Sequence, residues 1–231
     1  MTTLPFKLMI DPAPTQFLLT VRGKMAPANR EAGRQAHNIA AGSDQGVAAA
    51  RSFGDLSHSV FVPVDAPGAG AGELLIVDFW NSVEGLQQFF SDEQVQKGGA
   101  MLFTSRDAVV WASTPGMPHF NLPAPTGRND RFLGIVRGPV KSREAAEKSL
   151  AISLKRSANT ARAKGLMMRE WYFRADQPNS LELIGVDLWF DGKGMAEAYA
   201  DPAEMAVFAD LFTGRPETSV WTKPEGQWVE W

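Results

Sequence analysis

An internal repeat constrains this chain more than any other feature of its sequence. Three segments of the first half return in the same order in the second half: 17–23 (FLLTVRG) as 132–138 (FLGIVRG), 74–80 (LLIVDFW) as 183–189 (LIGVDLW), and 101–106 (MLFTSR) as 210–215 (DLFTGR). The three pairs share 13 identities in 20 positions, where ordinary residue usage would give roughly one. The sequence therefore predicts two copies of one unit, each of a typical domain size.

The two copies are separated by a segment of linker composition. Residues 114–130 contain four prolines and two glycines among polar residues, which is typical of a loop. We expect an N-terminal unit at 1–117, a linker at 118–130 and a C-terminal unit at 131–231.

Each copy shows the periodicities of the order β-α-β-β-α-β. The expected strands and helices alternate at 17–22, 27–53, 58–64, 74–80, 83–103 and 108–113, and again at 132–137, 142–164, 167–174, 181–189, 194–212 and 219–221. This order is that of the ferredoxin-like split βαβ unit, an α+β arrangement with both helices on one face of an antiparallel sheet. The other face of each sheet needs a cover, and we expect the two sheets to pack against each other within the chain.

Composition excludes several classes of function. The chain has no cysteine, which removes disulfides, thiolate nucleophiles and thiolate metal sites. Lys and Arg number 23 against 26 Asp and Glu, for a net charge of −3, so neither nucleic acid nor an anionic membrane is an expected partner. No apolar run approaches the roughly 18 residues that span a bilayer, and a soluble cytoplasmic protein is expected. Metal-binding and hydrolase motifs are absent, and no metal or other cofactor is expected.

The fold order and one local element resemble a known superfamily. Residues 74–80 end in Trp80 and lead into 81–92 (NSVEGLQQFFSD), a short helix with Glu-Gly-Leu and paired aromatics. This element resembles the antibiotic-biosynthesis-monooxygenase-like and EthD-like domains of the dimeric α/β-barrel superfamily. The resemblance implies two ferredoxin-like units, here fused in tandem, whose antiparallel sheets form an intramolecular α/β barrel. It also implies that a monomer suffices for the barrel, with higher oligomers left open.

Two histidines are the candidate catalytic residues. Alignment of the copies places His37 on Leu150, within the apolar stripe of the second copy's first helix, so His37 should face the sheet. It places His58 on Arg169, on the strand face that also carries Val60. The two imidazoles could converge on a pocket, with His58 as the better candidate for a general base. The alternative for each is a hydrogen-bonded core residue, and His119 lies in the linker, at a pocket rim or in solvent.

Matched acids and aromatic residues supply the remaining candidates. Asp78 and Asp187 interrupt apolar strands at equivalent positions, each two residues before a Trp on the same face, and each needs a buried partner. Because both copies keep the pattern, a structural role at the sheet edges or the barrel seam is preferred to catalysis for these two acids. Trp80, Trp171, Asp78 and Phe90 are the candidate substrate-binding residues, since a wall of aromatic side chains suits a flat hydrophobic ligand.

The functional expectation is therefore a small-molecule enzyme that resembles the cofactor-independent monooxygenases. Its partner would be a small hydrophobic molecule, an aromatic or polyketide-like substrate. The alternative is a non-catalytic ligand-binding or stress-response barrel protein. Because all three histidines precede residue 120, any active pocket is expected in the first copy.

Overall fold

The structure is a computed structural model that describes residues 16–64, 72–114, 117, 119–122, 131–177 and 179–231. The first half contains β1 (Phe17–Met25), α1 (Arg30–Ala41), α2 (Asp44–Ser52), β2 (Asp55–Pro63), β3 (Glu73–Trp80), α3 (Val83–Ser91), α4 (Glu93–Leu102) and β4 (Phe103–Ser113). After β5 (Phe120–Asn121), the second half contains β6 (Phe132–Pro139), α5 (Arg143–Ala163), β7 (Leu166–Arg174), β8 (Glu182–Trp189), α6 (Gly192–Tyr199), α7 (Pro202–Ala209) and β9 (Glu217–Thr222).

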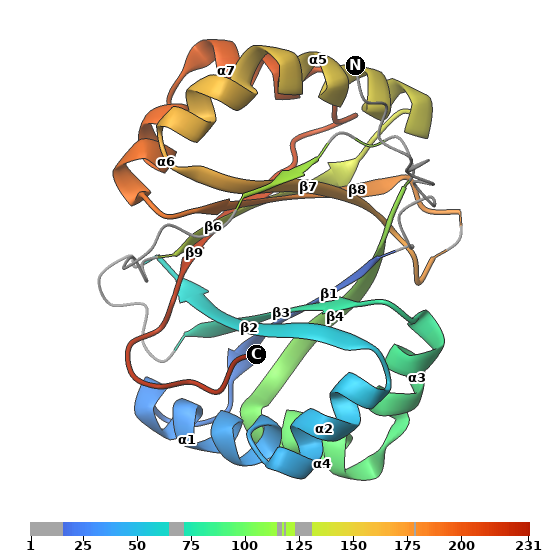
Figure 1. Ribbon diagram of the computed structural model, residues 1–231, viewed down its shortest axis with the longest axis vertical. Coiled ribbons are helices and arrows are strands. Elements are labelled where there is room, and N and C mark those ends of the chain that lie inside the picture. Colours follow the sequence, from blue (N-terminus) through green and yellow to red (C-terminus); the bar gives the residue numbers. More distant parts are fainter. Residues whose placement is uncertain (1–15, 65–71, 115–116, 118, 123–130, 178) are drawn as a thin grey trace, which may run out of the picture.

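The strands of the two halves pair in the same order. The long strands run β4-β1-β3-β2 in the first half and β9-β6-β8-β7 in the second, and β2 pairs with β9 at the junction. A further antiparallel pairing joins β4 to β7, so the strand pairings return to the first half. Figure 1 shows the two sets of strands facing each other, with the helices on their outer sides. The α+β class with a large antiparallel sheet is confirmed.

Alternation along the strands divides the apolar side chains between an inner core and outer cores. The inner core lies between the two sets of strands and draws on both halves, with Leu18, Phe61, Trp111, Tyr172 and Trp221 among its buried members. The outer cores lie between strands and helices within each half. The space between the sheets is thus largely filled, and a chemical site has to use either a gap in it or a helix-covered face.

The helices are more divided than the sequence predicts. The helix expected over 27–53 is two helices, because Gly42 ends α1 and the side chain of Ser43 caps α2. The helix expected over 83–103 divides at Asp92, whose carboxylate accepts from two amides at the start of α4. No helix in the described ranges is long and apolar enough to cross a membrane.

The expected linker at 118–130 contains a short strand. Within it, β5 pairs with the edge of β7, with Phe120 opposite Arg169. Residues 118 and 123–130 of this segment lie outside the described part of the chain.

Candidate functional site

Helix α1 places His37 against the sheet of the first half. The side chain of Asn29 caps the helix by accepting from the amide of Ala32 at 2.9 Å. Gly33 lets the helix approach closely, because an added Cβ would lie 2.8 Å from the sulfur of Met25. His37, one turn further on, is 1% exposed and points toward the strands, as the repeat alignment predicts.

Strands β2 and β3 place a second histidine and a carboxylate opposite it. His58 and Asp78 are direct partners in the β2–β3 ladder, and both side chains are buried on the helix-covered face. Nδ1 of His58 lies 2.8 Å from Oδ1 of Asp78. Nε2 of His58 lies 2.9 Å from Nε2 of His37, so the three side chains form one hydrogen-bonded chain. The structure thus brings the two predicted histidines into direct contact.

The hydrogen-bond partners of the histidine pair fix where its protons lie. Asn38 donates from Nδ2 to the carbonyl of Gln227, and its Oδ1 accepts from the amide of Val229, so its orientation is set by main-chain groups. That Oδ1 lies 3.1 Å from Nδ1 of His37, which must therefore donate. Nδ1 of His58 donates to the Asp78 carboxylate. Both Nε2 atoms then face each other, and a single proton between them completes the chain.

The electrostatic environment favours that proton on His58. Burial opposes charge on His58, but the Asp78 carboxylate outweighs it, and the pKa of His58 is raised. Burial and the neighbouring His58 lower the pKa of His37 to about 4. When the pair holds that proton, His58 is therefore the protonated donor and His37 the neutral acceptor.

The last nine residues, 223–231, cover the histidine pair, and we call them the strap. The strap leaves β9 and crosses to the first half near α1 and β2 (Figure 1). The main chains of His58 and Trp231 exchange two hydrogen bonds, of 2.8 and 3.2 Å. The Trp231 ring stacks on His58 with centroids 4.5 Å apart, and the Trp228 ring tilts against His37 at 5.2 Å.

A second carboxyl group, Asp55, joins the strap to the site. Its Oδ2 accepts from the indole nitrogen of Trp231 at 3.1 Å, while its buried Oδ1 has no hydrogen-bond partner among the described residues. Burial, together with the nearby carboxylate of Asp78, raises the pKa of Asp55 to about 7. The site thus holds two histidines and two carboxyl groups under an indole lid.

The other predicted site residues divide between the two halves. Trp80 lies on the same face as Asp78 and packs against Phe90 at 6.0 Å, and its indole nitrogen is buried without a partner among the described residues. Trp171 does not join them, because it lies in the outer core of the second half against Phe208. His119 is exposed, with Nδ1 3.1 Å from the carbonyl of Met117.

Sequence reasoning missed Asn38, Asp55 and the strap. Asn38 follows His37 directly, but nothing in the sequence shows which main chain its amide meets. Asp55 begins β2, where a carboxylate is expected to be solvated. The signal in the strap is its two tryptophans, Trp228 and Trp231, in a segment without helical or strand periodicity.

Two of the hollows among the described residues are well defined, and neither of these two is lined by the histidine pair. One is an open depression of about 440 Å³ between the α2–β2 turn and the start of α3. The other, about 30 Å³, lies between the sheets and has room for a water molecule. It is lined by Arg22, Arg137 and Glu217 among others.

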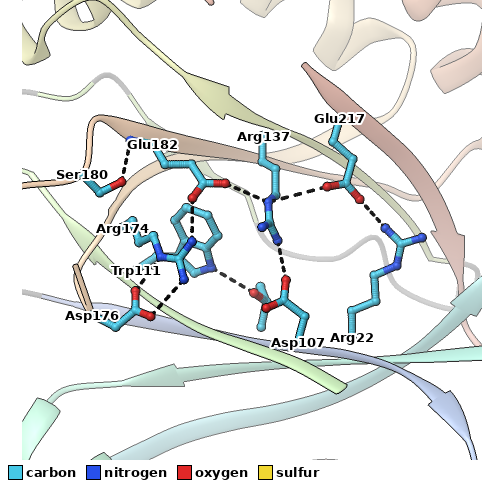
Figure 2. Close-up of polar contacts among 10 residues, drawn as sticks. Arg22, Asp107, Trp111, Arg137, Arg174, Asp176, Ser180, Glu182 and Glu217 are labelled. Atoms are coloured by element: carbon cyan, nitrogen blue, oxygen red, sulfur yellow. Dashed lines mark hydrogen bonds and ion pairs between the residues drawn. The ribbon is translucent and has the colours of Figure 1, made fainter. Parts of the chain in front are cut away.

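Figure 2 shows the ion pairs around this small cavity. Arg22 pairs with Glu217 of β9 at 2.5 Å, and Arg137 reaches Asp107 of β4 at 2.9 Å, so each arginine bridges the two halves. Arg137 also pairs with Glu182 at 3.0 Å. Because these arginines are matched by acids, the network fits a structural link better than an anion site. Within the described ranges, no group of three or more acids and histidines is arranged to hold a metal ion.

Comparison with known proteins identifies the fold. No protein-family model matches the sequence, and no curated protein is similar to it in sequence. Solved structures do match: a proposed monooxygenase from Fusobacterium nucleatum has a TM-score of 0.60 at 10% identity, covering 95% of this chain and 98% of that one. An anthrone oxidase-like protein has a TM-score of 0.60 at 15% identity, covering 90% and 91%.

A third similar structure is described as a ferredoxin-fold protein. It comes from Listeria monocytogenes and is related to antibiotic biosynthesis monooxygenases, with a TM-score of 0.51 at 8% identity, covering 93% of this chain and 98% of that one. At these identities the likeness shows the fold that this chain shares with those proteins, and it indicates neither an activity nor a substrate.

Proposed function

We propose that the protein is a cofactor-independent monooxygenase that acts on an aromatic or polyketide-like substrate, with its site at the histidine pair. The observation that carries the proposal is the buried chain from Asp78 through His58 to His37, in a fold shared with monooxygenase-like proteins. We further propose that the chain is a tandem fusion of two ferredoxin-like units whose sheets close into an α/β barrel, so that a monomer suffices.

The chemistry asked of the site is removal of a proton from a phenolic or enolic hydroxyl. The resulting anion is the electron-rich form of such a substrate that can pass electrons to dioxygen. With Nδ1 of His37 held by Asn38 and Nδ1 of His58 held by Asp78, the neutral pair offers two facing lone pairs to one incoming proton. Asp78 then stabilises the cation that forms, which is the role of the orienting acid in a base dyad.

Dioxygen uptake with hydroxylated polycyclic substrates, without added cofactor, tests the proposal. We expect H58N and H37N to lower kcat/KM by about 100-fold or more, which is the usual range for loss of a general base. The matched control is Leu150→Met at the position equivalent to His37, where a volume-conserving change leaves the site untouched. Retention of wild-type activity by H58N would overturn the assignment.

A binding protein without turnover is the second candidate. It is favoured by the burial of the pair under the strap, since His37 and His58 are only 1% and 6% exposed. Tight binding of a hydroxylated aromatic compound without dioxygen uptake would establish this candidate in place of the enzyme.

A further inference from the structure

The strap contacts His58 of the histidine pair through a flat aromatic ring, the indole of Trp231. The Trp231 ring lies over His58 at 4.5 Å with an interplanar angle of 20°, which is a stacked geometry. Its one polar atom, Nε1, donates to Oδ2 of Asp55 at 3.1 Å. A flat ring and a single directed donor therefore already occupy the space beside the pair.

The site beneath the strap is not completed by the described residues alone. Oδ1 of Asp55 is buried without a hydrogen-bond partner among them, and the residue is 5% exposed. A buried carboxyl oxygen with no partner is costly, so it points to a donor supplied from elsewhere.

The strap is attached by polar contacts and by the packing of its two indoles. The polar contacts near the pair include the two main-chain bonds at His58, the bonds of Gln227 and Val229 to Asn38, and the contact of Glu230 with the amide of Val60 at 2.6 Å. The Trp228 indole packs on the outer core of the first half. Trp228 and Trp231 are only half-buried. Displacement of Trp231 leaves the inner core intact, because that core lies on the opposite side of the strands and contains no residue of the strap.

We propose that Trp231 occupies the place of the ligand and that Asp55 selects a planar aromatic molecule bearing an O–H or N–H donor, which displaces Trp231 on binding. The inference rests on the proposed function only for the location of the site. It adds Asp55 as the residue that determines ligand specificity and the strap as the element that moves.

Calorimetric titration with 2-naphthol and its methyl ether, 2-methoxynaphthalene, tests the selectivity. W231A should bind 2-naphthol at least tenfold more tightly than the wild type, because no indole has to be displaced. The ether, which lacks the donor, should bind W231A at least tenfold more weakly than 2-naphthol, and D55A in the W231A background should abolish that difference. Equal binding of the two compounds by W231A, or binding of neither, overturns the proposal.

Two controls protect this result against misfolding. W231F keeps a ring over His58 but lacks the N–H, so it should fold and bind 2-naphthol with an affinity between those of the wild type and W231A. W171F alters a tryptophan of the other half and should bind as the wild type does. A W171F protein that gains affinity as W231A does would show a general loosening and overturn the proposal.

Hydrogen exchange in the wild type tests displacement directly. The Trp231 amide donates to the His58 carbonyl at 3.2 Å, and its exchange should accelerate at least tenfold when 2-naphthol saturates the protein. Unchanged exchange with 2-naphthol bound overturns the inference. If 2-naphthol displaces Trp231 but the protein shows no dioxygen uptake, only the proposed function is overturned. If the protein is active and Trp231 stays in place over His58, only this inference is overturned.

Discussion

The two halves place different chemistry at one backbone position. In the first half His58 faces Asp78 across the β2–β3 ladder, and in the second half Arg169 faces Asp187 across β7–β8 in the same register. Arg169 donates to both carboxylate oxygens, at 2.8 and 2.7 Å. An arginine cannot give up its proton near neutral pH, while a histidine can. The fold thus supports a fixed ion pair on one side and a titratable chain on the other.

The residues around the two aspartates also differ between the halves, and they differ as a matched pair. In the second half, the Tyr199 hydroxyl donates to Asp187 at 3.1 Å, and it fits because Gly134 leaves room: an added Cβ would lie 2.0 Å from it. In the first half the equivalent residues are Phe90 and Leu19. Both belong to the outer core of the first half, and neither side chain can donate a hydrogen bond, which leaves the carboxylate of Asp78 to the histidine pair.

The largest expected effect is on the fixed pair. Arg169→Met should lower the free energy of unfolding by about 3–5 kcal/mol, because it leaves the Asp187 carboxylate buried without its cation. Urea denaturation followed by circular dichroism measures this. Since Arg169 lies outside the proposed site, a folded R169M protein should keep the dioxygen uptake of the wild type. A loss of stability below 1 kcal/mol would mean that Asp187 does not depend on Arg169 for its charge to be buried, and the contrast with Asp78 and His58 would fail.

The next largest loss of stability is expected at the equivalent helix position of each half, which is Leu150 in the second half and His37 in the first. Leu150 is 2% exposed in an apolar outer core, so Leu150→His should cost about 2–5 kcal/mol through lost packing and an unpartnered imidazole. His37→Leu should cost less, because leucine fits the apolar pattern of the helix, although the change removes the hydrogen bonds of His37 to His58 and Asn38. Thermal melting of both variants measures the difference. Equal losses would show that the two positions are not equivalent.

The sequence is sufficient to predict which histidines meet, but not what holds them. The repeat alignment put His37 and His58 on facing surfaces, because helical and strand periodicity determine the face of a residue. It could not pair His58 with Asp78, because the β2–β3 register shifts between Asp55 and Ser57. A shift of one residue changes every cross-strand partner.

The strap was unpredictable for a different reason. It has no periodicity, and its path depends on contacts with α1 and β2, which are distant in sequence. In the second half, β5 covers the corresponding edge, with Phe120 opposite Arg169 as Trp231 is opposite His58. That equivalence becomes visible only once the sheets are assembled.

The stability contributed by Asp55, which lies under the strap, should depend on pH. The folded protein keeps the Asp55 proton up to about pH 7, while the unfolded chain releases it near pH 4, so stability falls as pH rises between these values. D55N lacks this loss and keeps an acceptor for Trp231. Its stability relative to the wild type should therefore rise from pH 4 to pH 8, by roughly 2 kcal/mol or more at about 1.4 kcal/mol per pKa unit. Denaturant unfolding at both pH values measures it, and a constant difference would exclude a raised pKa at Asp55.

The smallest effect is expected where the halves do not differ. Arg22 and Arg137 occupy equivalent positions, each reaching an acid of the other half, and their side chains are 35% and 24% exposed. Pairs with this access to solvent contribute about 0–1 kcal/mol, so Arg22→Met and Arg137→Met should each cost no more than about 1 kcal/mol, and by similar amounts. Both losses should shrink in 1 M salt, where the Debye length falls to about 3 Å. Unfolding in low and high salt measures this. A much larger cost for one arginine would show that the difference between the halves extends from the helix-covered face into the space between the sheets. The small cavity beside Arg22 and Arg137 would then be a second candidate site.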